Sequence, residues 1–367
     1  MQKTAHKEMR CSFFDRSSLY IVPAFSHGHS HGAASSTVST TASIPAPTPW
    51  PEHTTSNPES FNPYSVNMTH LELFNNLFSK EFLSFEESGQ PDIIPTALYT
   101  KHALTTPYLM HQILAMSALQ LSTRTTDSRR FYREYATGLQ NRALSLFNES
   151  KPVLEVTPAN CVHMFLFSSL IGVHLLCDTL HYQRDSLEGF IDRFTYCLSV
   201  YRGVLAVIDQ SWHLLRETEL GPRLKLSRVL TEPTDASGSE CDTLRDLVNV
   251  ADGTPSSRKA YRESVLHLQQ VFDAQRAASG NKTRIPVIFA WPILVSPDYV
   301  DLLRQRQAEA LVILAHYAVL LHRGRNLWLI GEGGQFLIES ICGSLGSDWQ
   351  EWLKFPKAAL QEEGLTA

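Results

Sequence analysis

The stretch CVHMFLFSSLIGVHLLC, from Cys161 to Cys177, is the most apolar part of the chain. A helix that spans a membrane needs about 20 consecutive apolar residues. This stretch is shorter, and it contains two histidines and two serines. Its apolar residues lie on all sides of a helix, as they do in helices buried within a protein. We therefore predict a core helix over residues 159–180, opened by Pro158, and no association with a membrane.

On both sides of this stretch, apolar residues recur every three or four positions, which is typical of helices with one buried face. The pattern predicts helices over residues 69–86, 127–148, 159–180, 186–215, 259–278, 298–322 and 335–346, and one that begins at Pro107. Turn-forming residues predict irregular connections over 231–241, 252–257 and 284–297. The sequence shows no series of alternating strands and no internal repeat, so the predicted fold class is all-α.

Composition and cysteine spacing argue against two kinds of function, nucleic-acid binding through charge and zinc binding through CxxC pairs. The chain has 367 residues, is 43% hydrophobic and carries a formal net charge of −5, which argues against nucleic-acid binding through charge alone. Six cysteines occur, none closer to the next than the 16 positions between Cys161 and Cys177, so CxxC zinc pairs are absent. Most of them lie in apolar helical patterns, as expected for reduced thiols of an intracellular protein.

The N-terminal part differs in amino-acid composition from the rest of the chain. Of residues 26–60, more than half are Ser, Thr or Pro, and no Lys or Arg occurs between Arg16 and Lys80. Such a segment buries too little apolar surface to offset the entropy of ordering it. We predict a disordered tail and linker over residues 1–66, followed by one large helical domain over residues 67–360. The histidines within 27–31 are interpreted as part of a flexible polar tract.

No motif indicates catalysis, a metal or a cofactor. His174, Cys177, Asp178 and His181 share one side of a helix, but the neighbours Cys177 and Asp178 diverge by about 100° and do not converge on one ion. The glycines of the segment 331–334 lack the preceding strand and following lysine of a phosphate-binding loop. We therefore predict no catalytic residue, no metal ligand and no cofactor.

Several segments in succession carry a family resemblance. They are PYLMHQILAMSALQL at 107–121, YRGV at 201–204, WP at 291–292, ALVILAHYAVLL at 310–321, Trp328 with Gly331, and the segment 349–356 with Trp349, Trp352 and Pro356. In this order they resemble the regulatory domain of fungal zinc-cluster transcription factors, the sterol uptake control or sterol-regulatory type in particular. The resemblance covers roughly residues 68–357.

The resemblance implies a helical regulatory domain in the nucleus, or in nucleus and cytoplasm. It also implies a sterol-like or other apolar ligand, held between the C-terminal helices, and either a protein partner or a homodimer. By similarity, the ligand-binding residues would be Tyr299, Leu303, Leu314, Tyr317, Leu321, Trp328, Gly331 and Gly334. The family supplies no catalytic residue.

One departure from the family concerns DNA. The family's DNA-binding module is basic and holds two zinc ions with six cysteines, whereas only Cys11 precedes the linker here. We therefore expect no direct DNA binding by the chain as written. Three explanations stay open: a stand-alone regulator, an upstream exon that encodes the module, and a domain adapted to another task.

The leading hypothesis is a transcription-regulator-like protein that controls sterol or secondary metabolism. The alternatives are an enzyme that uses an apolar pocket for a cofactor-free cyclisation or isomerisation, and an interaction module without a ligand. The turn after Trp328 separates these hypotheses. In a ligand sensor, we expect Gly334→Asp to change ligand binding with little effect on thermal stability. In a plain core, Trp328 fills space and the glycines end a helix.

Overall fold

The computed structural model describes residues 66–85, 93–150, 156–227, 238–251, 253–277 and 285–362. Over these ranges the chain forms α-helices, short 3-10 helices and turns, and no strand, so the prediction of an all-α fold is confirmed. The chain divides into two units, Met1–Leu71 and Glu72–Ala367. Residues 1–65 of the predicted tail lie outside the described residues, as do residues 231–237 of the connection predicted over 231–241. Of the connection predicted over 252–257, residues 255–257 are instead helical, because Thr254 caps a helix that begins at Pro255.

The first five α-helices of the described residues include a closely packed pair. Their bounds are α1 at Met68–Asn76, α2 at Thr96–Ala103, α3 at Pro107–Arg124, α4 at Arg129–Glu149 and α5 at Cys161–Tyr182. Helix α3 packs against both α4 and α5. As predicted, Pro107 occupies the first turn of α3, where a missing N–H costs nothing. The helix predicted over 69–86 ends earlier, at Asn76.

Helix α5 contains the apolar stretch that opened the sequence analysis. Among the described residues, it is the one single helix with the length and hydropathy of a membrane span, and 72% of that apolar window is buried inside the protein. Burial against neighbouring helices is what a core helix shows, which confirms the predicted core position. The helix begins at Cys161, three residues after Pro158, because Pro158 and its successors form a turn.

Serine and threonine caps define the starts of three later helices. Ser186 caps α6 (Leu187–Leu215), Thr254 caps α9 (Pro255–Arg276) and Ser296 caps α12 (Pro297–Arg304), each by accepting a hydrogen bond from a backbone N–H of the first turn. Such caps satisfy backbone donors that have no partner within the helix. Two of these helices also have proline in the first turn, which suits its fixed φ.

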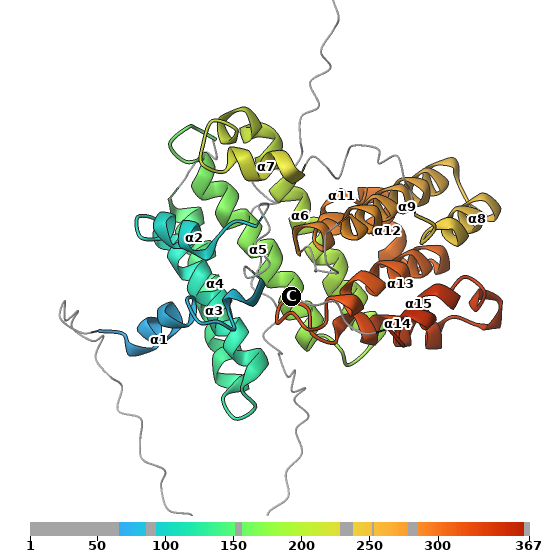
Figure 1. The fold of residues 1–367 in the computed structure, drawn as a ribbon, viewed down its shortest axis with the longest axis horizontal. Coiled ribbons are helices and arrows are strands. Elements are labelled where there is room, and N and C mark those ends of the chain that lie inside the picture. The colour runs from blue at the N-terminus through green and yellow to red at the C-terminus, as the bar shows by residue number, and fades with distance from the viewer. Residues whose placement is uncertain are drawn as a thin grey trace, which may run out of the picture. The chain divides into compact units, whose positions relative to one another are not determined.

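The remaining helices assemble around α13 (Ala308–Arg323), which is buried along nearly all of its length. The others are α7 at Gly221–Ser227, α8 at Asp242–Val250, α10 at Ile285–Ile288, α11 at Ala290–Leu294, α14 at Gly333–Ser344 and α15 at Lys354–Ala359. Helix α13 packs on α9, α14 and α15, while α6 packs on α5, α11 and α12. Figure 1 shows α8 to α15 on one side of α6 and α2 to α5 on the other.

Two predictions for the C-terminal half are wrong. The region 284–297 contains the short helices α10 and α11. The helix predicted over 298–322 is interrupted at Arg306, whose φ of 58° lies in the left-handed region. The Arg306 guanidinium donates a hydrogen bond of 2.8 Å to Asp192 on α6, and this contact helps to offset the backbone strain. The break lets α12 fold back against α13.

Candidate ligand-binding site

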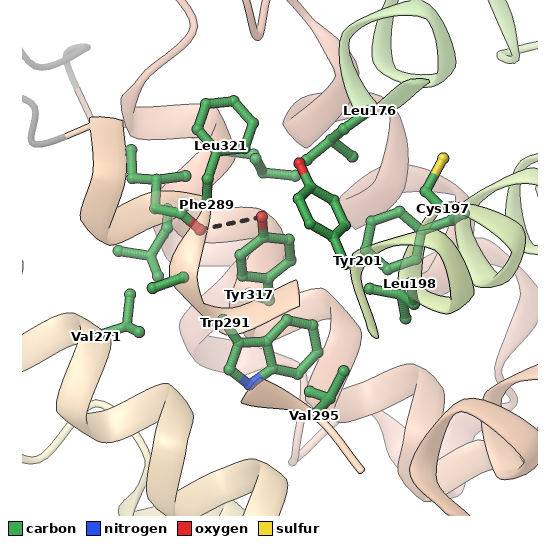
Figure 2. Packing of buried hydrophobic residues seen from close by; sticks show 14 of the residues in the cluster. Leu176, Cys197, Leu198, Tyr201, Val271, Phe289, Trp291, Val295, Tyr317 and Leu321 are labelled. Atoms are coloured by element: carbon green, nitrogen blue, oxygen red, sulfur yellow. Dashed lines mark hydrogen bonds between the residues drawn. The ribbon is translucent and has the colours of Figure 1, made fainter. Parts of the chain in front are cut away.

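The C-terminal helices meet at a cluster of buried aromatic rings. Trp291 on α11 stacks on Tyr317 of α13, with ring centroids 4.5 Å apart and planes 25° apart. Its other neighbour is Tyr299 of α12, whose ring meets it edge-on at 5.6 Å. Figure 2 shows Tyr317 above Trp291, with Leu321 and Phe289 nearby. The rings come from three different helices, so only the tertiary fold assembles the cluster.

The polar atoms of these three side chains are used within the protein. The indole N–H of Trp291 donates to the carbonyl of Ser264 at 3.0 Å. The hydroxyls of Tyr299 and Tyr317 donate to the carbonyls of Ala310 and Ile288, at 3.0 and 3.2 Å, the latter drawn dashed in Figure 2. These bonds tie neighbouring elements together. They therefore support the packing of the C-terminal half rather than leaving polar groups available to a ligand.

Tyr201 on α6 differs from the other rings of the cluster. Its side chain is 2% exposed, and its hydroxyl forms no hydrogen bond within the described residues. The ring is pressed against α5, since a Cβ placed on Gly172 would lie 2.6 Å from Tyr201 Cε1. Burial raises the pKa of this phenol well above its usual value. Figure 2 shows it beside Tyr317, with the hydroxyl directed away from Trp291.

A buried donor without a partner is costly, and native proteins contain few of them. Sequence reasoning did not select Tyr201 as a site residue, because its position on the apolar side of α6 indicates core. It did not select Trp291 either. The signal that was present for both residues was their place in the quoted family motifs. The structure brings the two together with the predicted residues Tyr317 and Leu321.

The turn after α13 has its own set of contacts around Trp328. The indole N–H donates to the Phe82 carbonyl at 3.1 Å, and the Trp328 and Phe82 rings lie 5.3 Å apart. His181 Nε2 on α5 donates to the Trp328 carbonyl at 2.7 Å. Burial lowers the pKa of His181 to about 4, so the imidazole is neutral near pH 7. Trp328 is therefore tied to Phe82 and to α5.

The glycines of this turn are required for two separate reasons. Gly331 has a φ of 53°, in the left-handed region, and a Cβ there would also lie 2.6 Å from His181 Cε1. At Gly334, a Cβ would lie 2.3 Å from the backbone nitrogen of His322, so α14 crosses α13 in direct backbone contact. A larger side chain at Gly334 cannot enter without separating the two helices, so Gly334→Asp should lower stability in a ligand sensor and in a plain core alike. The substitution therefore does not separate these two hypotheses.

The eight predicted ligand-binding residues fall into two groups. Five are fully buried in the C-terminal core, namely Tyr299, Leu303, Leu314, Tyr317 and Leu321. The other three are Trp328 and Gly331 in the turn after α13 and Gly334 in the first turn of α14. The two groups border each other where α14 crosses α13. The hydrogen bonds of Trp328, however, go to Phe82 and His181 rather than to the aromatic cluster.

The groups that first suggested a metal site on α5 have separate partners. His174 Nδ1 lies 3.5 Å from Gln112 Nε2. The Asp178 carboxylate forms ion pairs with Arg133 and Arg193. Across the described ranges, no three His, Cys, Asp or Glu side chains are placed to hold a metal ion. Burial raises the pKa of the Cys197 thiol to about 11 and lowers that of His174 to about 3. Both groups are thereby held neutral, whereas a nucleophilic thiol needs the opposite shift.

The described helices thus enclose a mostly aliphatic core with a cluster of aromatic rings among the C-terminal helices. No protein-family model matches the sequence. The chain is 24% identical over 304 residues to a Zn(2)-C6 fungal-type transcription factor of Gibberella zeae. The match covers 77% of this chain and 59% of that relative, so the chain spans little more than half the length of the relative. The described cysteines, four of them buried and far apart in sequence, do not fit a zinc cluster.

Proposed function

We propose that this protein is a transcription regulator of the fungal zinc-cluster type, and that the helical region is its regulatory domain. The observation that carries the proposal is the similarity to the Gibberella zeae factor over most of the chain. The all-α fold supports it, because the family resemblance implies a helical regulatory domain. By the same argument the protein acts in the nucleus and regulates transcription rather than catalysing a reaction.

The finer part of the proposal is that the domain senses an apolar molecule that carries one hydroxyl or carbonyl group. It rests on Tyr201, whose hydroxyl has no hydrogen-bond partner among the described side chains and lies among apolar groups beside Tyr317 and Leu321. Binding sites for such ligands are mostly apolar, with few polar groups that set orientation. A hydrogen bond from Tyr201 to the ligand would satisfy this donor, and the regulated pathway would be sterol or secondary metabolism.

A pair of sterols tests the ligand. We expect a sterol with a free 3-hydroxyl to raise the melting temperature of the full chain more than the 3-deoxy analogue does. A ligand that binds only the native state, at a concentration 100 times its dissociation constant, stabilises a protein by about 2.7 kcal/mol. Tyr201→Phe should remove the difference between the two sterols. The control Tyr182→Phe, whose hydroxyl donates to Ser122 rather than to a predicted ligand-binding residue, should keep it. If neither sterol shifts the melting temperature of the wild type, sterol sensing is wrong.

A reporter assay tests regulation itself. The full chain, fused to an unrelated DNA-binding domain, should change the expression of a reporter gene that carries the matching DNA site. The control is the unrelated DNA-binding domain alone, expressed at the same level. A fusion that is present in the nucleus and leaves expression unchanged would contradict the regulatory role. That outcome is independent of the sterol result, which concerns the ligand only.

DNA contact is proposed to come from a partner. The net charge of −5 and the wide spacing of the cysteines support this assignment. In a mobility-shift titration with the full chain at moderate salt, we expect no sequence preference. A tight complex that survives an excess of competitor DNA would show that the chain binds DNA by itself. The enzyme alternative is not favoured, since the buried thiols and histidines are held in neutral forms.

A further inference from the structure

Two histidines from separate helices meet outside the candidate ligand-binding site. His102 lies at the end of α2, and His163 lies in the first turn of α5. His102 Nδ1 is 3.3 Å from His163 Nε2, and the ring planes are inclined by 79°, so the contact joins two nitrogens and is not a stack. The His102 side chain is 16% exposed, so water and small ions can reach the pair.

Glu219, in the turn between α6 and α7, holds His102 from the other side of its ring. His102 Nε2 lies 2.7 Å from Glu219 Oε1, and Lys101 Nζ donates to Oε2 of the same carboxylate at 2.9 Å. Because a carboxylate oxygen only accepts hydrogen bonds, His102 Nε2 carries the proton of the neutral imidazole. Nδ1 of that ring is then unprotonated, and its lone pair faces His163.

The nitrogen pair has the spacing of two imidazoles bound to one zinc ion. Zinc–nitrogen bonds are about 2.0–2.1 Å long, and a tetrahedral angle between two of them places the nitrogens about 3.4 Å apart. The observed separation is 3.3 Å. Metal-bound histidines commonly donate their second ring N–H to a carboxylate, which fixes the tautomer and the ring orientation. His102 makes this contact with Glu219.

Without a metal, the same contact is one hydrogen bond in which His163 Nε2 donates to His102 Nδ1. A zinc ion would take the place of that single proton. The two states need nearly the same side-chain positions, so the ion would enter a site that is already formed, and little ordering would oppose binding. Glu219 is bound to the far nitrogen of His102, so two side chains contact the ion and water supplies its remaining ligands.

We propose that His102 and His163 bind a divalent transition-metal ion, zinc in particular, and that the ion links α2 to α5. Glu219 positions His102 and does not contact the metal. Imidazole nitrogen suits zinc, whereas magnesium and calcium prefer oxygen ligands. The ligands are histidines of the helical region, unlike the cysteines that hold zinc in the DNA-binding module of the resembled family. The site is independent of the proposed function.

Calorimetric titration with zinc chloride tests the binding. The parent protein is the full chain with His27, His29 and His31 replaced by serine, because these closely spaced histidines could bind zinc by themselves. We expect one zinc ion per chain and a dissociation constant of about 10 μM, since only two protein ligands hold the ion. Magnesium chloride, which delivers the same charge, should give no binding heat.

Four variants of the parent protein locate the site. His102→Gln and His163→Gln should each weaken zinc binding at least tenfold. Glu219→Gln should weaken it about tenfold, the usual effect of losing a group that orients a metal ligand. Because Glu219 is exposed, this variant keeps the test valid if a histidine variant unfolds. The control His267→Gln alters a partly buried histidine of α9 that contacts Gln270, and it should bind zinc as the parent does.

Thermal melting and hydrogen exchange test the link between the helices. Zinc at about ten times its dissociation constant should raise the melting temperature of the parent by about 3 °C, and a chelator should reverse the shift. Zinc should also slow amide exchange in α2. His163→Gln should abolish this protection of α2, although the substituted residue lies on α5.

Three results would overturn the proposal. The first is a parent protein that binds no zinc at concentrations up to about 1 mM. The second is zinc binding that His102→Gln and His163→Gln leave unchanged, which would place the ion elsewhere on the chain. The third is an equal response to magnesium, which would show a general effect of charge rather than coordination by imidazole.

Discussion

Gly334 of α14 lies directly against the backbone of His322 in α13, so close that a Cβ on the glycine would be 2.3 Å from the His322 nitrogen and 2.8 Å from the Ala318 carbonyl oxygen. Both neighbours are backbone atoms of a fully buried helix and cannot move aside cheaply. The glycine therefore sets the distance between the two helices. The Trp328 turn that leads into α14 depends on this contact for its position.

Replacement of Gly334 by alanine should destabilise the protein by about 3 kcal/mol, because overpacking at a rigid contact forces the helices apart. Gly343, in the last turn of the same helix, is the matched control. Nothing lies within 4 Å of its missing Cβ, so Gly343→Ala should be neutral or slightly stabilising. Urea denaturation of both variants measures the difference. Equal midpoints would show that α14 does not rest on α13 as described.

Tyr201→Phe should stabilise the ligand-free protein by about 1 kcal/mol. The substitution removes a buried hydroxyl that has no partner among the described residues, and with it the cost of desolvation. Tyr317→Phe, its neighbour in the cluster, should destabilise by about 1 kcal/mol because it deletes the hydrogen bond to the Ile288 carbonyl. Thermal unfolding in parallel distinguishes the two signs. A loss of stability in both variants would mean that the Tyr201 hydroxyl is hydrogen-bonded in solution.

Acid should unfold this protein partly through its buried histidines. Burial lowers the pKa of His174 to about 3 and that of His316 to about 4, against about 6.5 in the unfolded chain. Below pH 6.5 the unfolded chain therefore binds more protons than the folded one. Stability should fall as the pH drops from about 6.5 to about 4, by about 1.4 kcal/mol per pH unit for each histidine.

Urea denaturation at a series of pH values measures this slope, and the variant His316→Gln gives the comparison. The variant has one group fewer that the unfolded state protonates, so its stability should depend less steeply on pH between 6.5 and 5. A slope identical to that of the wild type would show that His316 is already charged, or equally accessible, in the folded protein.

Deletion of residues 1–66 should leave the melting temperature within about 2 °C of the full chain. The segment is rich in Ser, Thr and Pro and shows little apolar periodicity, so it has few residues to contribute to a core. Differential scanning calorimetry of both chains tests this expectation. A much lower melting temperature would mean that part of the segment packs on the helices.

The ends of individual helices show how much of the fold the local sequence determines. Pro107 and the pairs Thr254–Pro255 and Ser296–Pro297 mark helix starts by chemistry that acts within one turn. Apolar periodicity places α5 and α6 within one or two residues. These signals need no distant partner, and they are sufficient for the all-α class. The short helices α7 and α15 carry too few turns for periodicity to reveal them.

Other features depend on residues that are far apart in the sequence. The pattern from 298 to 322 is helical throughout, yet the helix breaks at Arg306, whose guanidinium donates a hydrogen bond to the distant Asp192 of α6. Leu314 and Leu321 were predicted to face a ligand, yet their burial says only that they lie in the core.

The features of the candidate site are likewise of two kinds, those that local sequence determines and those that helix packing determines. The sequence by itself determined that this is an all-α protein with an apolar C-terminal core and a close approach near Gly331 and Gly334, because periodicity and glycine act locally. Only the tertiary structure decided which rings meet Trp291 and that Gly334 rests on the His322 backbone. It alone decided, too, that the Tyr201 hydroxyl finds no partner within the part of the chain that the structure describes. Those outcomes follow from the packing of α5, α6, α11 and α13 against one another, and no local pattern encodes the distances between them.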